Sequence, residues 1–303
     1  MIQPQSLQPG DLIGIVCPAG SIPLERVQKC VEILTQWGYQ VILGKTIGTK
    51  KDSFSASDTE RAADLQEMLD NPKVKAILCG RGGYGVSRII DQISFEVFAK
   101  SPKWVIGFSD ITVLHAAIQK QGSMSIHGPM AAAFSKGEDG APYINALKDI
   151  LAGCSTQYTA KSNALNKMGT VTAPIIGGNL CLIAHLIGSK NSLDTAGKIL
   201  FLEDIGEYHY NLDRMVLQIK NAGLFDKIAG LIIGGITDMR DPSSDFGANA
   251  FQIIQSHVKD FTFPICYDFP ISHALENYPI KEGAVYTLEV HMDKVILKED
   301  SRN

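Results

Sequence analysis

Short apolar runs alternate with helix-like stretches through the first half of the chain. The stretches at residues 23–37 and 57–69 predict helices, with Ser57 or Asp58 as the cap of the second. The predicted strands around them occupy residues 12–17, 39–43, 76–79 and 104–106. This rhythm predicts an α/β fold whose mainly parallel sheet has helices on both faces. Ligands bind beyond the carboxyl ends of the strands in such sheets, so we expect the site there.

A second block of elements follows a stretch without strand rhythm. Residues 130–168 are rich in turn-forming and polar residues, and they predict a last helix and a linker. Apolar strand patterns then resume at residue 171 and alternate with helical ones. We therefore expect three parts: an N-terminal α/β domain over residues 1–150, a linker over 151–170, and a smaller mixed α/β C-terminal domain over 171–303.

Charge and cysteine usage narrow the class of protein. The formal net charge of -4 argues against nucleic-acid binding, which needs a strongly basic surface. No apolar run reaches the roughly 18 residues of a membrane helix, and the first ten residues lack the pattern of a signal peptide. The six cysteines are scattered without a Cys-x-x-Cys pair, which indicates reduced thiols and no zinc site. We expect a cytoplasmic protein with no membrane partner, metal or cofactor.

Ser109 lies where the strand at residues 104–106 turns into an amphipathic helix. A tight turn of this kind holds a serine hydroxyl above the sheet, and it places the next backbone N–H at a helix N-terminus, ready for a developing oxyanion. The pattern Gly-x-Ser-x-Gly is incomplete because Ile111 replaces the second glycine. The alternative interpretation is that Ser109 only caps the helix.

A glycine-rich turn follows the strand at residues 76–79. Residues 80–85 fit Gly-x-Gly-x-x-Gly, the dinucleotide-binding pattern, but they follow the third predicted strand and no acidic residue lies about 20 positions on. Such a turn can also present backbone N–H groups to an oxyanion. A purely structural use, in which the glycines allow close packing, stays open.

Carboxylates and a histidine follow two strands of the second block. Glu203 and Asp204 end the strand at residues 199–202, where they could orient a histidine or merely be solvated. His273 lies in a loop between two prolines and has the most suggestive setting of the seven histidines. Ser109, Glu203 and His273 together match a nucleophile, the carboxylate that orients a general base, and the general base itself, in that order.

At these segments the sequence resembles the LD-carboxypeptidases of murein recycling, which are grouped with the microcin C immunity peptidases. The resemblance spans nearly the whole chain and includes the glycine-rich turn, the Ser109 turn and the Glu203 strand end. Its further segments are residues 10–20, 177–180, 213–215 and 273–283. One departure is Ser272, where the family usually has glycine before the histidine.

The resemblance implies a two-domain serine peptidase that works without metal. Ser109 would be the nucleophile, Glu203 the orienting carboxylate and His273 the general base. The backbone N–H groups of Asp110 and Gly83 would form the oxyanion hole. The family also suggests a homodimer.

Two substrate classes occur in the family. One is the murein tetrapeptide, which loses its terminal D-alanine; the other is a peptidyl-nucleotide antibiotic, whose base stacks on a tryptophan between the domains. The tryptophans here, Trp37 and Trp104, lie outside residues 130–170, which favours a murein peptide, although Phe134 or Tyr143 could also stack.

Three residues are candidates for binding the substrate carboxylate: Arg81, Asn179 and Arg214. Each of them could equally be a surface or capping residue. Two functions of other classes remain as alternatives, namely a nucleotide-dependent oxidoreductase that uses the turn at residues 80–85 and a non-catalytic peptide- or sugar-binding module.

Overall fold

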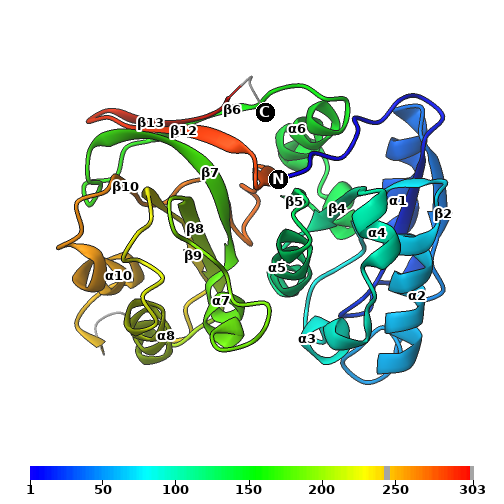
Figure 1. Cartoon of the computed structure of the whole chain (residues 1–303), viewed down its shortest axis with the longest axis horizontal. Coiled ribbons are helices and arrows are strands. Elements are labelled where there is room, and N and C mark those ends of the chain that lie inside the picture. The colour runs from blue at the N-terminus through cyan, green and yellow to red at the C-terminus, as the bar shows by residue number, and fades with distance from the viewer. Residues whose placement is uncertain (242–245, 301–303) are drawn as a thin grey trace. The chain divides into compact units, whose positions relative to one another are not determined.

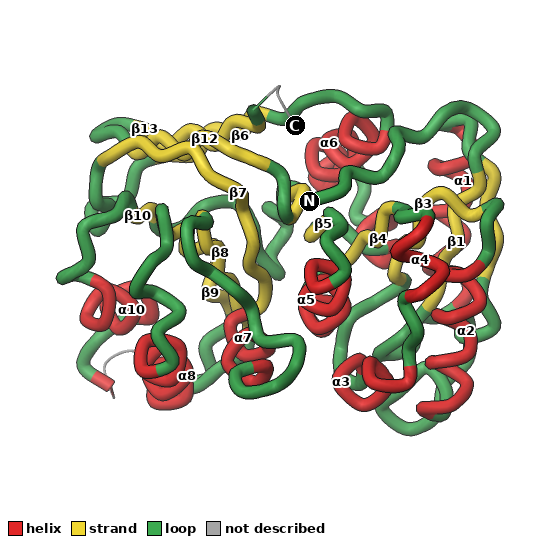
Figure 2. The backbone as a smooth tube through the Cα atoms, in the orientation of Figure 1, coloured by secondary structure: helices red, strands yellow, loops and turns green. Residues whose placement is uncertain are grey.

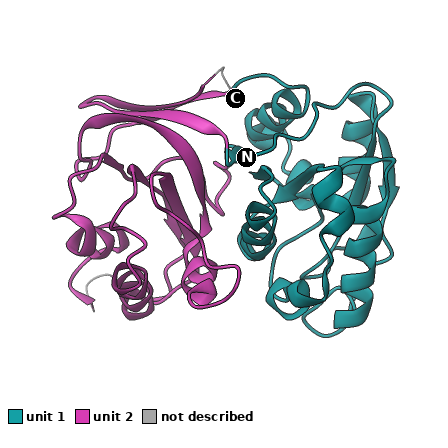
Figure 3. Cartoon of the chain, in the orientation of Figure 1, with its two compact units in different colours: residues 1–155, 278–283 teal, residues 156–277, 284–303 magenta. Residues whose placement is uncertain are grey.

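The computed structural model describes residues 1–241 and 246–300. The chain divides into two compact units (Figure 3). Unit 1 contains Met1–Ser155 and Tyr278–Gly283, and unit 2 contains Thr156–Asn277 and the chain from Ala284 onward. Each unit has one sheet flanked by helices (Figure 1), which confirms the predicted two-domain α/β class.

Unit 1 is built on a six-stranded, mainly parallel sheet. In sheet order its strands are β11 (Ile280–Glu282), β5 (Ser125–His127), β4 (Trp104–Gly107), β3 (Val74–Cys79), β1 (Leu12–Val16) and β2 (Gln40–Leu43). All neighbours are parallel except β11, which pairs antiparallel with β5. The central strands are buried along nearly their whole length because helices cover both faces, so their sequences are continuous apolar runs.

The helices of unit 1 follow the predicted pattern closely (Figure 2). α1 buries Val27, Cys30 and Leu34, which share one face at helical spacing. Ser57 caps α2 in a capping box with Glu60. The helices are α1 (Leu24–Gln36), α2 (Asp58–Asp70), α3 (Val86–Ile89), α4 (Glu96–Lys100), α5 (Thr112–Lys120) and α6 (Ala141–Leu151), with 3-10 turns η1 (Ile90–Gln92), η2 (Ser109–Ile111), η3 (Ala131–Ser135) and η4 (Glu138–Gly140).

Unit 2 contains a seven-stranded mixed sheet. In sheet order its strands are β10 (Ile265–Cys266), β9 (Gly230–Thr237), β8 (Ile199–Ile205), β7 (Gly169–Asn179), β12 (Val285–Val290), β13 (Lys294–Glu299) and β6 (Gln157–Lys161). The four strands from β10 to β7 are parallel, and the pairings from β7 to β6 are antiparallel. Its described helices are α7 (Leu180–Leu186), α8 (His209–Asn221) and α10 (Ala250–Val258), with α8 against both others.

The segment expected to be a linker, residues 151–170, belongs to secondary structure at both ends. α6 extends to Leu151, β6 occupies Gln157–Lys161, and β7 begins at Gly169. Polar residues alternate in β6 because it is an edge strand with one face exposed, so its composition imitates a loop.

Among the described residues, no helix is both long enough and apolar enough to cross a membrane.

Candidate active site

Ser109 has a left-handed backbone conformation, with φ of 64°. It is the first residue of η2, directly after β4 and Phe108. A residue with a Cβ atom rarely adopts this conformation, which costs roughly 1–2 kcal/mol, and such strain is typical of a nucleophile elbow. No side-chain cap bond is found at the start of η2 or α5, and Ser109 Oγ has no hydrogen-bond partner within the described chain. The helix-cap interpretation is therefore wrong.

The elbow requires glycine at two neighbouring positions. A Cβ atom on Gly82 would lie 2.9 Å from Ser109 Cβ and 3.1 Å from its Oγ. A Cβ atom on Gly107 would lie 2.9 Å from Ile111 Cγ1. Contacts this short are not tolerated, so the glycine-rich turn gives Ser109 its room and the strand end gives Ile111 its room in the same turn.

The turn at residues 80–85 packs its backbone against the loop after β1. Gly20 N–H donates to the carbonyl of Gly82 at 2.9 Å, and a Cβ on Gly20 would be 2.7 Å from that oxygen. Gly83 has φ of 110°, which favours glycine, and its N–H has no hydrogen-bond partner among the described residues. The turn thus brings an unused backbone donor into the loop that packs against Ser109.

The dinucleotide interpretation does not fit this turn. The helix after it, α3, has four residues, and the N–H of Val86 at its start donates to Asp110 Oδ2 at 2.8 Å. A dinucleotide site needs a helix N-terminus that is open to the pyrophosphate. Here the buried carboxylate of Asp110 occupies that position, and it ties the glycine-rich turn to the elbow.

Arg61 holds the same turn from the other side and was missed in the sequence. Its fully buried guanidinium donates to the carbonyls of Pro18 and Gly85 and pairs with Asp58 Oδ1 at 2.5 Å. Arg88 and Arg61 donate to Asp58 and lower the pKa of its carboxyl. An arginine in a polar helix is usually exposed, so the sequence carried no signal for this role.

His115 supports the elbow as a neutral core residue. Its Nε2 lies 2.9 Å from the carbonyl oxygen of Gly107, and its Nδ1 lies 2.8 Å from Ser125 Oγ. The carbonyl can only accept, so Nε2 carries the proton and Nδ1 accepts from the hydroxyl. Burial lowers the pKa of this histidine to about 4. The bond fixes the strand end from which the Ser109 turn departs.

Glu203 and His273 form a hydrogen-bonded pair in unit 2. His273 Nδ1 lies 2.6 Å from Glu203 Oε2. The glutamate on β8 is fully buried, and the histidine side chain is 13% exposed. A carboxylate that accepts from Nδ1 fixes the tautomer and leaves the lone pair of the neutral ring on Nε2. This is the arrangement of a general base with its orienting carboxylate.

Two glycines within β9 bring the histidine loop close to Glu203. A Cβ on Gly234 would lie 2.2 Å from the carbonyl oxygen of Ile271 and 3.2 Å from Glu203 Cβ. Gly235 N–H donates to the same carbonyl at 3.0 Å. These glycines were missed in the sequence, although a Gly-Gly pair after a buried strand is a usable sign of close backbone approach.

Ser272 fits the loop despite its departure from the family pattern. Its Oγ donates to the carbonyl of Glu276 at 2.9 Å and accepts from the N–H of Ala274 at 3.0 Å. A Cβ on Gly235 would lie 2.4 Å from Ser272 Cβ, so the glycine leaves room for the serine. The hydroxyl therefore stabilises the turn that carries His273.

Asp204 and Asn179 brace the strand end that carries Glu203. Asn179 caps α7 through Leu182 N–H and donates from Nδ2 to Asp204 Oδ1 at 2.8 Å. Asp204 also accepts from the N–H groups of Cys181 and Ile205. Burial, together with the charge of Glu203, raises the pKa of Asp204 to about 7. Asn179 was a candidate for binding the substrate carboxylate, and its amide is engaged here in holding β8.

The two candidate arginines are both exposed. Arg81 lies in the glycine-rich turn, and its Nη1 donates to the carbonyl of Ser21 at 3.3 Å. Arg214 lies on α8, and its guanidinium lies 5.4 Å from the ring centroid of Tyr210. Ser109, Gly83, Asp110 and Arg81 thus belong to unit 1, and Glu203, His273, Asn179 and Arg214 belong to unit 2. Across residues 1–241 and 246–300, no cluster of side chains suits a metal ion.

Comparison with known proteins supplies the family. Models of the LD-carboxypeptidase N-terminal and C-terminal domains match residues 13–128 and 172–288. The probable murein peptide carboxypeptidase of Bacillus subtilis is 32% identical over 286 residues, covering 93% of this chain and 90% of that protein. The microcin C7 self-immunity protein MccF of Escherichia coli is 28% identical over 260 residues, covering 74% of this chain and 75% of that protein.

A solved structure agrees with these matches in fold. The crystal structure of muramoyltetrapeptide carboxypeptidase from Oxalobacter formigenes has a TM-score of 0.87 to this chain at 29% identity. The match covers 96% of this chain and 99% of that one. The chain therefore belongs to the LD-carboxypeptidase family of peptidases.

Proposed function

We propose that this protein is a serine LD-carboxypeptidase that removes the terminal D-alanine of murein tetrapeptides during cell-wall recycling. Ser109 is the nucleophile, His273 the general base and Glu203 the carboxylate that orients the base. The single observation that carries the proposal is the left-handed conformation of Ser109, since such strain in a non-glycine residue is characteristic of a reacting group held at an elbow.

The reaction follows from the roles of these groups. His273 Nε2 removes the Ser109 hydroxyl proton while Oγ attacks the carbonyl carbon before D-alanine. The backbone N–H groups of Asp110 and Gly83 bind the oxyanion that forms. His273 then gives its proton to the leaving amine, D-alanine departs, and an acyl-enzyme remains on Ser109. Water, deprotonated by His273, attacks this ester. His273 returns that proton to Ser109 Oγ as the ester bond breaks, which releases the shortened peptide and restores the free serine.

The names of the relatives support a murein peptide as substrate. The Bacillus subtilis relative is called a murein peptide carboxypeptidase, and the Oxalobacter formigenes structure is a muramoyltetrapeptide carboxypeptidase. The match to MccF favours a second candidate, an amide of the peptidyl-nucleotide type. The absence of tryptophan from residues 130–170 supports the murein peptide over that alternative.

A product assay with both substrates tests the proposal. The protein is incubated with a murein tetrapeptide ending in D-alanine and, separately, with an aminoacyl nucleotide amide, and the products are identified by mass. We expect a tripeptide and free D-alanine from wild type and from Ser87→Ala, and no turnover from Ser109→Ala. Cleavage of the nucleotide amide alone would favour the second candidate. Turnover by Ser109→Ala would refute the serine mechanism.

Three further expectations belong to this proposal. The family resemblance favours a homodimer and a cytoplasmic location, which sedimentation and cell fractionation test. Arg81 is the candidate for the substrate carboxylate because it is exposed on the same turn as Gly83. An Arg81→Gln variant should then show a raised KM with a nearly unchanged kcat.

A further inference from the structure

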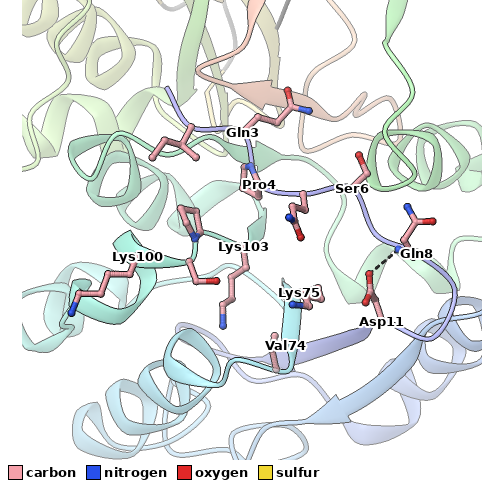
Figure 4. A pocket seen from close by; sticks show the side chains of 13 residues that line it. Gln3, Pro4, Ser6, Gln8, Asp11, Val74, Lys75, Lys100 and Lys103 are labelled. Carbon is pink, nitrogen blue, oxygen red and sulfur yellow. Dashed lines mark hydrogen bonds between the residues drawn. The ribbon is translucent and has the colours of Figure 1, made fainter.

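A pocket of about 420 Å³ lies at the amino ends of the strands of unit 1. It is lined at β1 by Asp11, at β3 by Val74 and Lys75, and at β4 by Lys103. The N-terminal segment forms another wall with Gln3, Ser6 and Gln8 (Figure 4). This segment is fixed, since Trp104 Nε1 donates to the carbonyl of Gln5 at 3.1 Å and Leu7 N–H donates to that of Leu151. The volume suits a small molecule.

The lining of this pocket carries an excess of positive charge. Lys75, Lys100 and Lys103 face one carboxylate, Asp11, whose Oδ2 already accepts from Gln8 N–H at 2.7 Å. Within the part of the chain that the structure describes, none of the three lysines has a carboxylate within ion-pair distance. Clustered like charges repel one another, and a bound anion would relieve the repulsion.

Lys103 makes the strongest case because its ammonium is buried. The residue is 6% exposed, and Nζ donates to the carbonyls of Asn71 at 2.6 Å and Met68 at 3.2 Å, at the end of α2. An ammonium has three donors, so one N–H has no protein acceptor within the described residues. Burial lowers the pKa of Lys103 to about 8, with Lys75 adding to the effect and Asp70 opposing it. A buried cation with no carboxylate within ion-pair distance is costly, and an anion in the pocket would offset that cost.

This pocket is separate from the elbow. Lys103 directly precedes β4, and Ser109 follows its far end, so the two lie at opposite ends of one strand. Substrates of open α/β sheets bind at the carboxyl ends, where Ser109 is. A ligand at the amino ends would therefore be an additional one.

We propose that this pocket binds a small molecule that carries at least two negative charges on phosphate or carboxylate groups. Lys75 and Lys100 attract the ligand at the mouth of the pocket, and Lys103 donates its third N–H to it. The glutamine and serine side chains of the N-terminal segment offer further donors to the same oxygens. Binding here leaves the elbow accessible and adds a second, independent ligand to the protein.

Calorimetric titration of the full chain tests the proposal, with inorganic pyrophosphate and citrate as probes at constant ionic strength. At least one probe should bind wild type and Lys120→Gln alike, since Lys120 is an exposed lysine at the end of α5. Lys75→Gln should weaken binding about tenfold, the effect of losing about 1.4 kcal/mol of charge-assisted contact. Pyrophosphate binding alone points to phosphate ligands, and citrate binding alone to carboxylates. If neither probe binds, or if Lys75→Gln binds as wild type does, the proposal is wrong.

A second readout isolates Lys103. Raising the pH from ~7.5 to ~9.5 should weaken citrate binding to wild type, because the lysine loses its proton while citrate keeps its charge. Lys103→Met should bind more weakly and lose most of this pH dependence, provided that circular dichroism shows it folded. Asp70 and Lys75, the charged groups that act on Lys103, are unchanged in this comparison. A pH dependence that persists in Lys103→Met would overturn the role assigned to Lys103.

Discussion

His273 Nδ1 lies 2.6 Å from Glu203 Oε2, and this carboxylate is fully buried on β8. A buried carboxylate needs a hydrogen-bonding partner, and the imidazole N–H supplies it. The pair is therefore both a means of fixing the histidine and a condition for keeping Glu203 in the core.

Removing the charge of Glu203 should abolish most activity while the fold survives. In Glu203→Gln the amide keeps the shape but no longer stabilises the imidazolium or fixes its tautomer, so kcat should fall on the order of 10⁴-fold, as in a serine peptidase triad. The control is Glu289→Gln, whose carboxylate lies 3.0 Å from His291 Nε2 in a half-exposed pair. Steady-state assays should show normal kcat for the control. A loss of less than about tenfold in Glu203→Gln would contradict the orienting role.

Glycine at position 109 should give a more stable protein than alanine. Both variants lose the nucleophile, but glycine adopts the left-handed conformation without strain, so Ser109→Gly should exceed Ser109→Ala in free energy of unfolding by about 1 kcal/mol. At Ser87, within helix α3, the alanine variant should instead exceed the glycine variant in free energy of unfolding by a similar amount. Urea denaturation measures both pairs. Equal stability of the two variants at position 109 would show that the turn is unstrained.

Substitutions at Gly235 and Ser272 should be energetically coupled, because the two residues are in close contact. Gly235→Ala places a Cβ 2.4 Å from Ser272 Cβ and should destabilise the protein by roughly 1–3 kcal/mol, with loss of activity as the His273 loop shifts. Adding Ser272→Gly removes the clashing atom, so the double variant should recover part of both losses. The coupling energy comes from unfolding and activity measurements of the four proteins. Strict additivity would mean that the contact does not position the loop.

Asp204 should make stability fall as the pH rises. Its pKa in the folded protein is about 7, above the ordinary aspartate value of 3.8. Between these values the folded state holds a proton that the unfolded state has released, so the contribution is complete at low pH and lost as pH rises through about 7. Asp204→Asn removes this contribution.

Urea denaturation at pH ~5 and ~7.5 measures the effect as a difference between the two conditions. Going from the lower to the higher pH, wild type and Asp293→Asn, an exposed control, should lose more stability, or gain less, than Asp204→Asn does. The hydrogen bond from Cys181 N–H that asparagine cannot accept lowers stability at both pH values, so it cancels in the difference. An identical pH difference in all three proteins would contradict the raised pKa.

The sequence predicts those strands and helices that a local hydrophobic pattern marks. The predicted strands before residue 110 correspond to β1, β2, β3 and β4, since buried parallel strands are continuous apolar runs. The sequence does not predict β6 because this strand is polar and lies at a sheet edge. It does not predict β11 because this strand has only three residues and pairs with β5, which is distant in the chain. No local period marks such strands.

The candidate site divides in the same way. Ser109 and Glu203 stand at strand ends that the apolar pattern locates, and His273 lies in the loop after β10. Arg61 and the Gly234–Gly235 contact depend on which segments approach in space, and a single sequence does not reveal that. Asn179 was a candidate for ligand binding because the same side-chain amide can cap a helix or bind a ligand, and the sequence does not distinguish the two uses.

The position of β11 has a consequence for synthesis on the ribosome. The strand that completes the sheet of unit 1 is Ile280–Glu282, whereas its partner β5 ends at His127. The β5 edge of the nascent chain therefore stays uncovered while β6 to β10 are translated. An uncovered edge readily pairs with other strands, so a stalled or truncated polypeptide is exposed to aggregation until Ile280–Glu282 emerge.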